Sequence, residues 1–276
     1  MNKILIALDI DGTLTDHPFH IPNDVINYLE KLYNEGISLL FVTGRTFEWG
    51  VKPLKEMPFP YFLSVQNGAI LIEMPKKNIL SKKYLSKNIL TPICLICENE
   101  KTDVVVYSGM EHADECYYRP DYFSSDLLKY VQARCKGLME HWIPLNSFDK
   151  LPFQNFPSAK CIAEQKSCLR IAEKIKSDLQ LHIPVISDPF DRSMGIAQMT
   201  LKDVDKGQAI SDFLAYHPGD QYTIIAAGDD YNDLPMLLRS DVAVAMNTAP
   251  EPVQRAATVI ADQGIIKGLE KAMEMI

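Results

Sequence analysis

Runs of largely apolar residues that end abruptly at a polar residue or a glycine recur along this chain. They cover residues 4–8, 37–42, 61–65, 222–227 and 242–246. Apolar runs of this length predict buried strands of a parallel sheet. Apolar residues also recur every three to four positions after residues 23, 206, 234 and 265, which predicts helices. The pattern therefore predicts repeated strand–helix–strand units with right-handed crossovers.

A hairpin interrupts this pattern at residues 61–72, where Asn67-Gly68 separates two apolar runs. We predict that its first arm is the third parallel strand and that its second arm is an antiparallel addition. The five lysines between residues 76 and 87 then predict a polar connection with a solvated face.

The pattern changes between residues 81 and 189, where aromatic residues and prolines are frequent and no Asp- or Gly-rich motif ends a strand. Helical periodicity covers residues 125–135 and 165–179. Strand-like runs cover residues 103–107, 158–163, 182–187 and 194–200. We predict an α/β protein with a Rossmann-like parallel-sheet core, built from residues 1–80 and 190–276. An α/β domain of residues 81–189, with an antiparallel sheet, is inserted between the two halves of this core.

Composition narrows the class of protein. The 276 residues are enough for two domains, and 47% of them are apolar, so a sizeable core can form. The net charge of −8 argues against binding to the nucleic-acid backbone. No secretory signal and no apolar stretch of membrane-spanning length is visible, so we expect no membrane partner. We expect a cytoplasmic protein whose six cysteines are reduced.

Cys94 and Cys97 have the spacing of zinc ligands. No second pair at matching spacing accompanies them, and the residues between them are apolar. We therefore expect a buried strand here, with a zinc site as the alternative.

Two carboxylates stand at the end of the first apolar run. Asp9 and Asp11 are two residues apart, so a continued strand would direct both side chains to the same side. Carboxylates this close repel each other unless a cation or a shared proton relieves them. Because ligands of open α/β sheets bind at the carboxyl ends of strands, this pair predicts a site that requires a cation. An ordinary Asp-rich turn is the alternative.

Three further junctions carry polar residues. Thr43-Gly44 ends the second predicted strand and offers a hydroxyl and backbone N–H groups to a phosphate oxygen, although a helix cap would also explain it. Lys206 begins a predicted helix against the preference of the helix dipole, which favours a ligand anion beside it. Asp229, Asp230 and Asp233 follow the strand at 222–227, and these are more carboxylates than capping requires.

The run Asp9-Ile10-Asp11-Gly12-Thr13-Leu14-Thr15 resembles the first motif of the haloacid dehalogenase (HAD) superfamily, and the other three junctions resemble its remaining motifs in order and spacing. The segments 67–69, 204–207 and 243–246 are similar to the Cof-like and sucrose-phosphatase-like branch, in which a large α/β cap is inserted after the third core strand. The resemblance covers residues 1–75 and 200–276. It departs from the family at Asn247-Thr248, where members often carry Gly-Asn.

The resemblance implies a Mg²⁺-dependent phosphohydrolase of small phosphorylated metabolites, such as sugar phosphates, that works through an aspartyl-phosphate. It implies Asp9 as the nucleophile and Asp11 as the general acid and base. Asp9 and Asp229 would hold Mg²⁺ through carboxylate oxygens and Asp11 through its backbone carbonyl, while Asp233 would order the outer shell. The implied phosphate-binding residues are Thr43, Gly44, Lys206 and Asn232.

Two other functions stay open. One is a phosphomutase on the same scaffold, which would return the phosphoryl group to its substrate. The other is a non-enzymatic phosphate-sensing module, which would not need an acid and base beside a nucleophile. A dinucleotide-binding protein is disfavoured because no Gly-x-Gly-x-x-Gly follows the first strand. The sequence names neither the substrate nor the oligomeric state.

Overall fold

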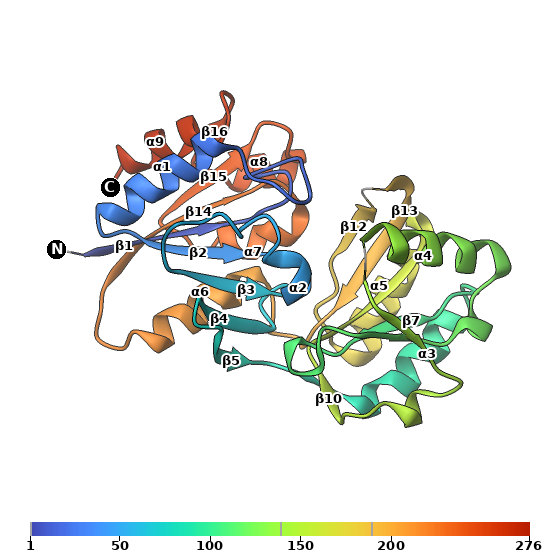
Figure 1. Cartoon of the computed structure of the whole chain (residues 1–276). Coiled ribbons are helices and arrows are strands. Elements are labelled where there is room, and N and C mark those ends of the chain that lie inside the picture. The colour runs from blue at the N-terminus through green and yellow to red at the C-terminus, as the bar shows by residue number, and fades with distance from the viewer. Residues whose placement is uncertain (1, 139, 189) are drawn as a thin grey trace. The chain divides into compact units, whose positions relative to one another are not determined.

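The computed structural model describes residues 2–138, 140–188 and 190–276 (Figure 1). The chain forms two compact units. The core unit contains the chain up to Arg45, Trp49–Lys82 and Val204–Ile276. The inserted unit contains Thr46–Glu48 and Lys83–Asp203. The predicted α/β class, with a parallel-sheet core and an inserted α/β domain, is confirmed.

The core unit is built on one sheet with the strand order β16-β15-β14-β1-β2-β3-β4-β5. Its strands are β1 (Lys3–Leu8), β2 (Ser38–Val42), β3 (Tyr61–Val65), β4 (Ile70–Met74), β5 (Asn78–Lys82), β14 (Tyr222–Gly228), β15 (Val242–Met246) and β16 (Val259–Ala261). The six strands from β16 to β3 are parallel, whereas β4 and β5 are antiparallel. The carboxyl ends of β1, β2 and β14 therefore meet at one edge of the sheet.

Helices cover both faces of this sheet. They are α1 (Asn23–Asn34), α6 (Lys206–Tyr216), α7 (Leu234–Leu237), α8 (Glu251–Ala256) and α9 (Ile265–Met273). Helices α6, α7 and α8 share one apolar cluster with the strands, and Phe213 and Met236 are fully buried in it. Helices α1 and α9 contact each other on the opposite face (Figure 1). One further short helix, α2 (Phe47–Gly50), follows β2.

The inserted unit has a six-stranded sheet with the order β12-β13-β11-β7-β8-β9. Its strands are β7 (Val104–Tyr107), β8 (Cys116–Tyr118), β9 (Trp142–Pro144), β11 (Ser158–Glu164), β12 (Val185–Asp188) and β13 (Asp191–Met199). All neighbouring pairs are antiparallel except β8 and β9. A separate pair, β6 (Leu85–Ser86) and β10 (Asn155–Phe156), is also antiparallel. The predicted antiparallel sheet is thus present with one parallel edge pair.

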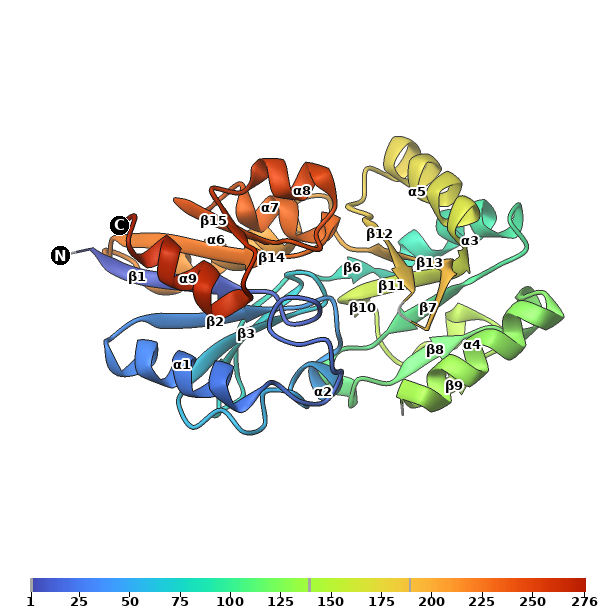
Figure 2. The ribbon, with the colours of Figure 1, turned by 90° about the horizontal axis from the view of Figure 1, so that it is seen from above.

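Helices also cover both faces of the second sheet (Figure 2). Helices α3 (Leu90–Glu98) and α5 (Gln165–Leu179) pack in one apolar cluster. Residues of α4 (Ser125–Leu138) pack in a second cluster with the other side of β7, β8 and β11.

The strand expected around Cys94 and Cys97 is wrong, because both residues lie in α3. Leu90, Ile93, Cys94 and Cys97 are buried on one face of this helix, while Leu95 is 60% exposed. Spacing by three and four residues, not alternation, sets which side chains are buried. All six cysteines are free.

Two segments differ from the sequence-based expectation. Part of the predicted polar connection forms β5, an edge strand whose two end residues are exposed and whose middle residues are half-buried. The predicted end of the inserted domain, residue 189, lies outside the described residues. The strand β13 that follows it pairs with β11 and β12, so the inserted unit continues to Asp203.

None of the helices within the described residues combines the length and the apolar character that crossing a membrane requires.

The inserted unit contains a buried lysine. Lys160 of β11 is only 7% exposed, and its ammonium lies 4.4 Å from the centroid of the Tyr107 ring. Burial lowers the pKa of Lys160 to about 8. Between pH 8 and its ordinary pKa the unfolded chain binds this proton and the native state does not, so raising the pH stabilises the native state.

Replacing Lys160 with Met should therefore stabilise the protein near pH 7.5, because the native state no longer has to hold a buried charge. The advantage of Lys160→Met over the wild type in unfolding free energy should shrink by about 2–3 kcal/mol between pH 7.5 and pH 10. Urea unfolding of both proteins across this range measures it. The same substitution at exposed Lys166 of α5 is the matched control and should leave the difference independent of pH. Parallel pH profiles for wild type and Lys160→Met would contradict the prediction.

Candidate active site

The site begins where β1 ends. Strand β1 stops at Leu8, and the backbone N–H of Asp9 still donates to Ala227 of β14 at 3.0 Å. Gly12 then turns the chain with a φ of +77°, a conformation that favours glycine. A Cβ at this position would collide with the carboxylate of Asp229. The turn therefore brings the loop after β1 against the loop after β14.

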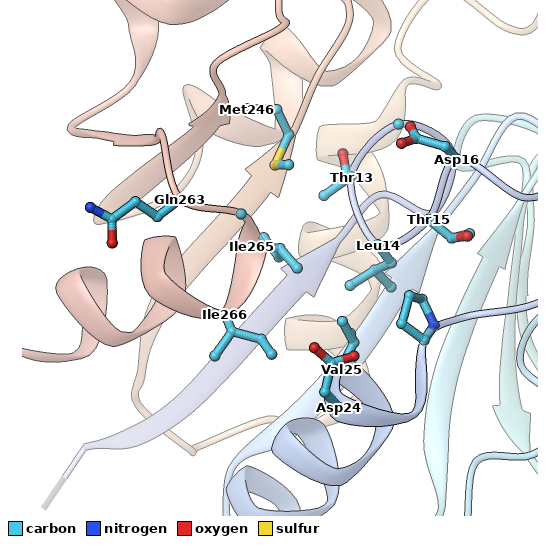
Figure 3. Close-up of a pocket in the computed structure, with 13 residues that line it drawn as sticks. Thr13, Leu14, Thr15, Asp16, Asp24, Val25, Met246, Gln263, Ile265 and Ile266 are labelled. Atoms are coloured by element: carbon cyan, nitrogen blue, oxygen red, sulfur yellow. The ribbon is translucent and has the colours of Figure 1, made fainter.

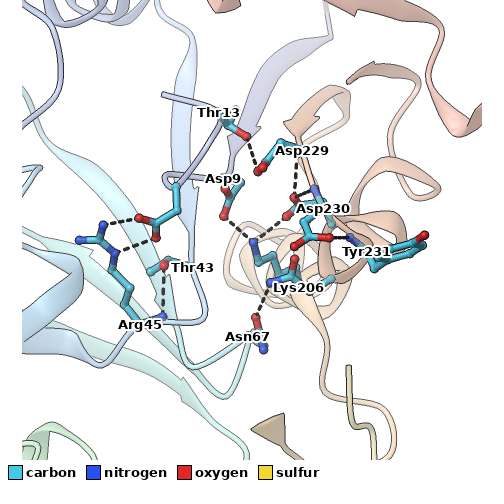
Figure 4. A network of polar contacts seen from close by, with 12 residues as sticks. Asp9, Thr13, Thr43, Arg45, Asn67, Lys206, Asp229, Asp230 and Tyr231 are labelled. Atoms are coloured by element: carbon cyan, nitrogen blue, oxygen red, sulfur yellow. Dashed lines mark hydrogen bonds and ion pairs between the residues drawn. The ribbon is translucent and has the colours of Figure 1, made fainter. Parts of the chain in front are cut away.

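Three carboxylates and one ammonium meet at this point (Figure 4). The Nζ of Lys206, the first residue of α6, forms an ion pair with Asp9 and a second one with Asp233 at 2.6 Å. Asp9, Lys206 and Asp233 are all buried. Thr13 donates from its hydroxyl to Asp229 at 3.2 Å. The predicted residues of the first, third and fourth junctions are thus brought together.

Asp233 is held on both of its oxygens. Oδ1 accepts from Lys206, while Oδ2 accepts the backbone N–H groups of Asp229 and Asp230 at 2.9 Å each. Asp230 caps the short 3₁₀ helix Tyr231–Asp233 with its own carboxylate. This reciprocal capping fixes the loop after β14, and with it the position of Asp229.

The cluster carries more negative charge than one ammonium neutralises. Burial is the main cause that raises the pKa of Asp9 well above its ordinary value; the neighbouring carboxylates add to it and Lys206 opposes it. Burial, and next the charge of Asp233, raises the pKa of Asp229 to about 7. Burial alone would lower the pKa of Lys206, but the charges of Asp233 and Asp9 raise it above its ordinary value. The excess negative charge favours a bound cation.

The donor set suits a hard cation. One carboxylate oxygen each of Asp9, Asp229 and Asp233 lies within 4.8 Å of the others. All three donors are oxygens, which Mg²⁺ prefers. Both oxygens of Asp233 already accept hydrogen bonds, so Asp9 and Asp229 are the better placed direct ligands. These residues fit a magnesium ion.

Asp11 has a different cationic partner from Asp9. Arg45 donates from Nε to Oδ2 of Asp11 at 2.7 Å and from Nη2 to Oδ1. The side chain of Asp11 is 56% exposed, whereas that of Arg45 is 6% exposed. The sequence predicts relief of the two carboxylates by a cation or a shared proton. In the structure, Lys206 pairs with one and Arg45 with the other.

The predicted phosphate-binding residues come from three places: Thr43 and Gly44 directly follow β2, Lys206 begins α6, and Asn232 lies in the loop after β14. Thr43 is buried, and its hydroxyl accepts the backbone N–H of Arg45 at 3.1 Å. The half-buried Gly44 lies between these two residues. Asn232 donates its side-chain N–H to Oδ1 of Asn67 at 3.3 Å. The amide donor expected from Asn232 is therefore engaged with the loop between β3 and β4.

A separate pocket lies beside the loop after β1 (Figure 3). Its walls come from that loop, the beginning of α1 and the beginning of α9. Val25, Met246, Ile265 and Ile266 supply an apolar lining. Asp9, Lys206 and Asp229 are not among its lining residues, whereas Thr13, which donates to Asp229, is.

Sequence reasoning gave no role to Thr13, Asn67 or Arg45. Thr13 and Asn67 were inside recognised motifs, but their partners Asp229 and Asn232 are more than 160 residues away in the chain. Arg45 directly follows Thr43-Gly44, and this position beside a motif was the one signal that could have identified it.

The sequence matches one described family. The profile of the haloacid dehalogenase-like hydrolases matches residues 6–273. A phosphoglycolate phosphatase from Nitrosopumilus maritimus is 24% identical over 276 residues, covering 98% of this chain and 96% of the relative. A glucosyl-3-phosphoglycerate/mannosyl-3-phosphoglycerate phosphatase from Persephonella marina is 22% identical over 247 residues, covering 87% of this chain and 84% of the relative.

Solved structures share the fold. A haloacid dehalogenase-like hydrolase from Bacteroides thetaiotaomicron superposes with a TM-score of 0.75 at 23% identity, covering 98% of this chain and 99% of its own. A sugar phosphatase of HAD subclass IIB superposes with a TM-score of 0.76 at 21% identity, covering 99% of this chain and 100% of its own.

Proposed function

We propose, since the chain belongs to the haloacid dehalogenase-like hydrolase family, that this phosphatase removes phosphate from a small phosphorylated metabolite through an aspartyl-phosphate on Asp9, with Mg²⁺ as cofactor. One observation carries the proposal. A buried carboxylate, Asp9, stands at the end of β1 beside Lys206, with Asp229 and Asp233 close enough to share a cation.

The reaction has two halves. In the first, an oxygen of Asp9 attacks phosphorus, the bond from phosphorus to the ester oxygen breaks, and Asp11 gives its proton to the leaving alcohol. In the second, a water oxygen attacks the same phosphorus and Asp11 takes a proton from that water. The bond from phosphorus to Asp9 then breaks, which restores the carboxylate and releases inorganic phosphate.

The remaining residues hold the phosphoryl group. The Thr43 hydroxyl, the Gly44 backbone N–H and the Lys206 ammonium are the donors for its oxygens, where negative charge gathers in the transition state. Asp9 and Asp229 would hold Mg²⁺, with the backbone carbonyl of Asp11 as a third donor and Asp233 fixing the loop behind them. When bound, the ion supplies positive charge that lets a phosphate dianion approach these carboxylates.

Sugar phosphates and phosphorylated hydroxy acids are the first substrate classes to test. The relatives described above include phosphatases of phosphoglycolate and glycosyl-3-phosphoglycerates, and a structural neighbour is a sugar phosphatase. A screen of both classes for phosphate release tests the proposal. Release without a bisphosphate activator supports hydrolysis, and transfer of the phosphoryl group back to the substrate would replace it with phosphomutase activity.

Metal removal should abolish the activity. EDTA is expected to stop phosphate release and Mg²⁺ to restore it, while Ca²⁺ should not, because Ca²⁺ takes more ligands in looser geometry. Mg²⁺ should also raise the melting temperature of the wild type, since a ligand that binds the native state stabilises it. Asp229→Asn, which removes a ligand oxygen, should abolish this rise. Full activity in excess EDTA would contradict the metal requirement.

A further inference from the structure

Arg45 is fixed within the core unit by groups other than Asp11. Its Nη1 donates to the backbone carbonyls of Pro18 at 2.7 Å and Trp49 at 3.3 Å. Its guanidinium carbon lies 5.2 Å from the centroid of the Trp49 ring. Its backbone carbonyl accepts the N–H of Gln66 at 2.9 Å. The guanidinium is therefore anchored on the protein side before any contact with Asp11 is counted.

The two partners of this ion pair are unequal. The anchored Arg45 is buried, whereas the side chain of Asp11, on the turn after Ile10, is 56% exposed. A guanidinium fork that meets both carboxylate oxygens fixes the plane of the carboxylate as well as its position. A lysine at the same place would supply charge without this planar constraint. The Arg45 fork therefore constrains the orientation of the Asp11 carboxylate.

We propose that Arg45 is a positioning residue that orients Asp11 for its two proton transfers. This inference rests on the proposed function, in which Asp11 gives a proton to the leaving oxygen and later takes one from water. Arg45 itself neither gives nor takes a proton and makes no bond to phosphorus. Its guanidinium has five N–H groups, of which four donate to Asp11, Pro18 and Trp49.

The proposal predicts a kinetic pattern that depends on the leaving group. In Arg45→Gln, kcat for an alkyl phosphate should fall about 10²-fold, as expected for a misplaced catalytic group, with little change in KM. A p-nitrophenolate leaving group needs little protonation, so aspartyl-phosphate formation should be nearly unaffected and its breakdown should become slow. The observable is a burst of p-nitrophenol before slow turnover. Arg45→Lys should retain only part of the kcat of the wild type.

Two further measurements separate positioning from a merely structural role. In the Asp11→Asn background, Arg45→Gln should cause no additional loss, because Arg45 acts through Asp11. In Arg45→Ala, added methylguanidinium should restore part of kcat. Arg119→Gln is the matched control, because Arg119 makes a similar two-point pair with Asp103 at 2.8 and 2.9 Å in the inserted unit. The Arg119→Gln variant should be less stable than the wild type and should show no burst of p-nitrophenol.

If Arg45→Gln lowers kcat as much in the Asp11→Asn background as it does in the wild type, the proposal is overturned. Arg45 would then contact the substrate directly or have a structural role. A burst in Arg119→Gln, or no burst in Arg45→Gln, would overturn it too. These outcomes differ from failure of the proposed function. In that case the wild type itself releases no phosphate, or Asp9→Asn retains its activity.

Discussion

Replacement of Asp9 with Asn is expected to reduce phosphate release to background, a fall of about 10⁴-fold or more, as for other enzymes that lose their nucleophile. The amide has nearly the shape of the carboxylate but cannot attack phosphorus. It also removes one oxygen ligand of the expected metal. Steady-state release from the best substrate of the screen, with Mg²⁺ in excess, measures the loss.

The fold should survive this change. The backbone N–H of Asp9 donates to Ala227 whatever its side chain is, and β1 stays paired with β14 and β2. Burial and the neighbouring carboxylates both raise the pKa of Asp9, which means that they disfavour its charged form. A neutral side chain at this position therefore relieves repulsion within the cluster. The melting temperature should be equal to or above that of the wild type. Asp16→Asn, an exposed carboxylate on the same loop, is the control and should keep its activity. Substantial activity in clean Asp9→Asn would remove Asp9 from its role.

The core fold could be predicted because its strands are buried on both faces. Such strands must be apolar throughout, and the helices between them have one apolar face, so the sequence marks both. The prediction that the chain is an enzyme of the HAD family is confirmed by the family match. The four junctions that carried the resemblance lie in this core.

The sequence prediction fails at one helix of the inserted unit, α3. The run around Cys94-Leu95-Ile96-Cys97 is apolar in any conformation, so four residues do not separate a strand from a helix. The longer pattern from Leu90 to Cys97 does distinguish a helix from a strand, because its spacing matches the buried face of α3. In the core unit, the sequence does not predict β5, because this edge strand is only partly buried and its polar residues hide the strand pattern.

The acidic cluster could be predicted in composition but not in its pairing. The sequence predicts Asp9 and Asp11 as neighbours on one strand, whereas β1 ends at Leu8 and the backbone turns at Gly12. Which cation each carboxylate meets then depends on residues 34 and 197 positions away in the chain. No local pattern holds that information, because it arises only when the sheet assembles.

Replacement of Asp11 with Asn is expected to separate its role from that of Asp9. General acid–base catalysis contributes about 10²–10⁴-fold, so kcat for alkyl phosphates should fall within this range. The carboxylate of Asp11 is not among the three described carboxylates that lie within 4.8 Å of one another, so Mg²⁺ binding should be nearly unchanged. The variant should lose some stability, about 1–3 kcal/mol, because buried Arg45 then faces an amide in place of a carboxylate.

The leaving group provides the decisive comparison for Asp11→Asn. With p-nitrophenyl phosphate, aspartyl-phosphate formation needs little proton donation and should stay fast. Breakdown then limits turnover, because water has lost its base. We expect a burst of about one equivalent of p-nitrophenol per enzyme, followed by slow release. Rapid mixing measures the burst, and calorimetry with Mg²⁺ measures metal binding. Equal losses for both leaving groups without a burst, or lost Mg²⁺ binding, would show that Asp11 is a metal ligand through its carboxylate and not the acid and base of the reaction.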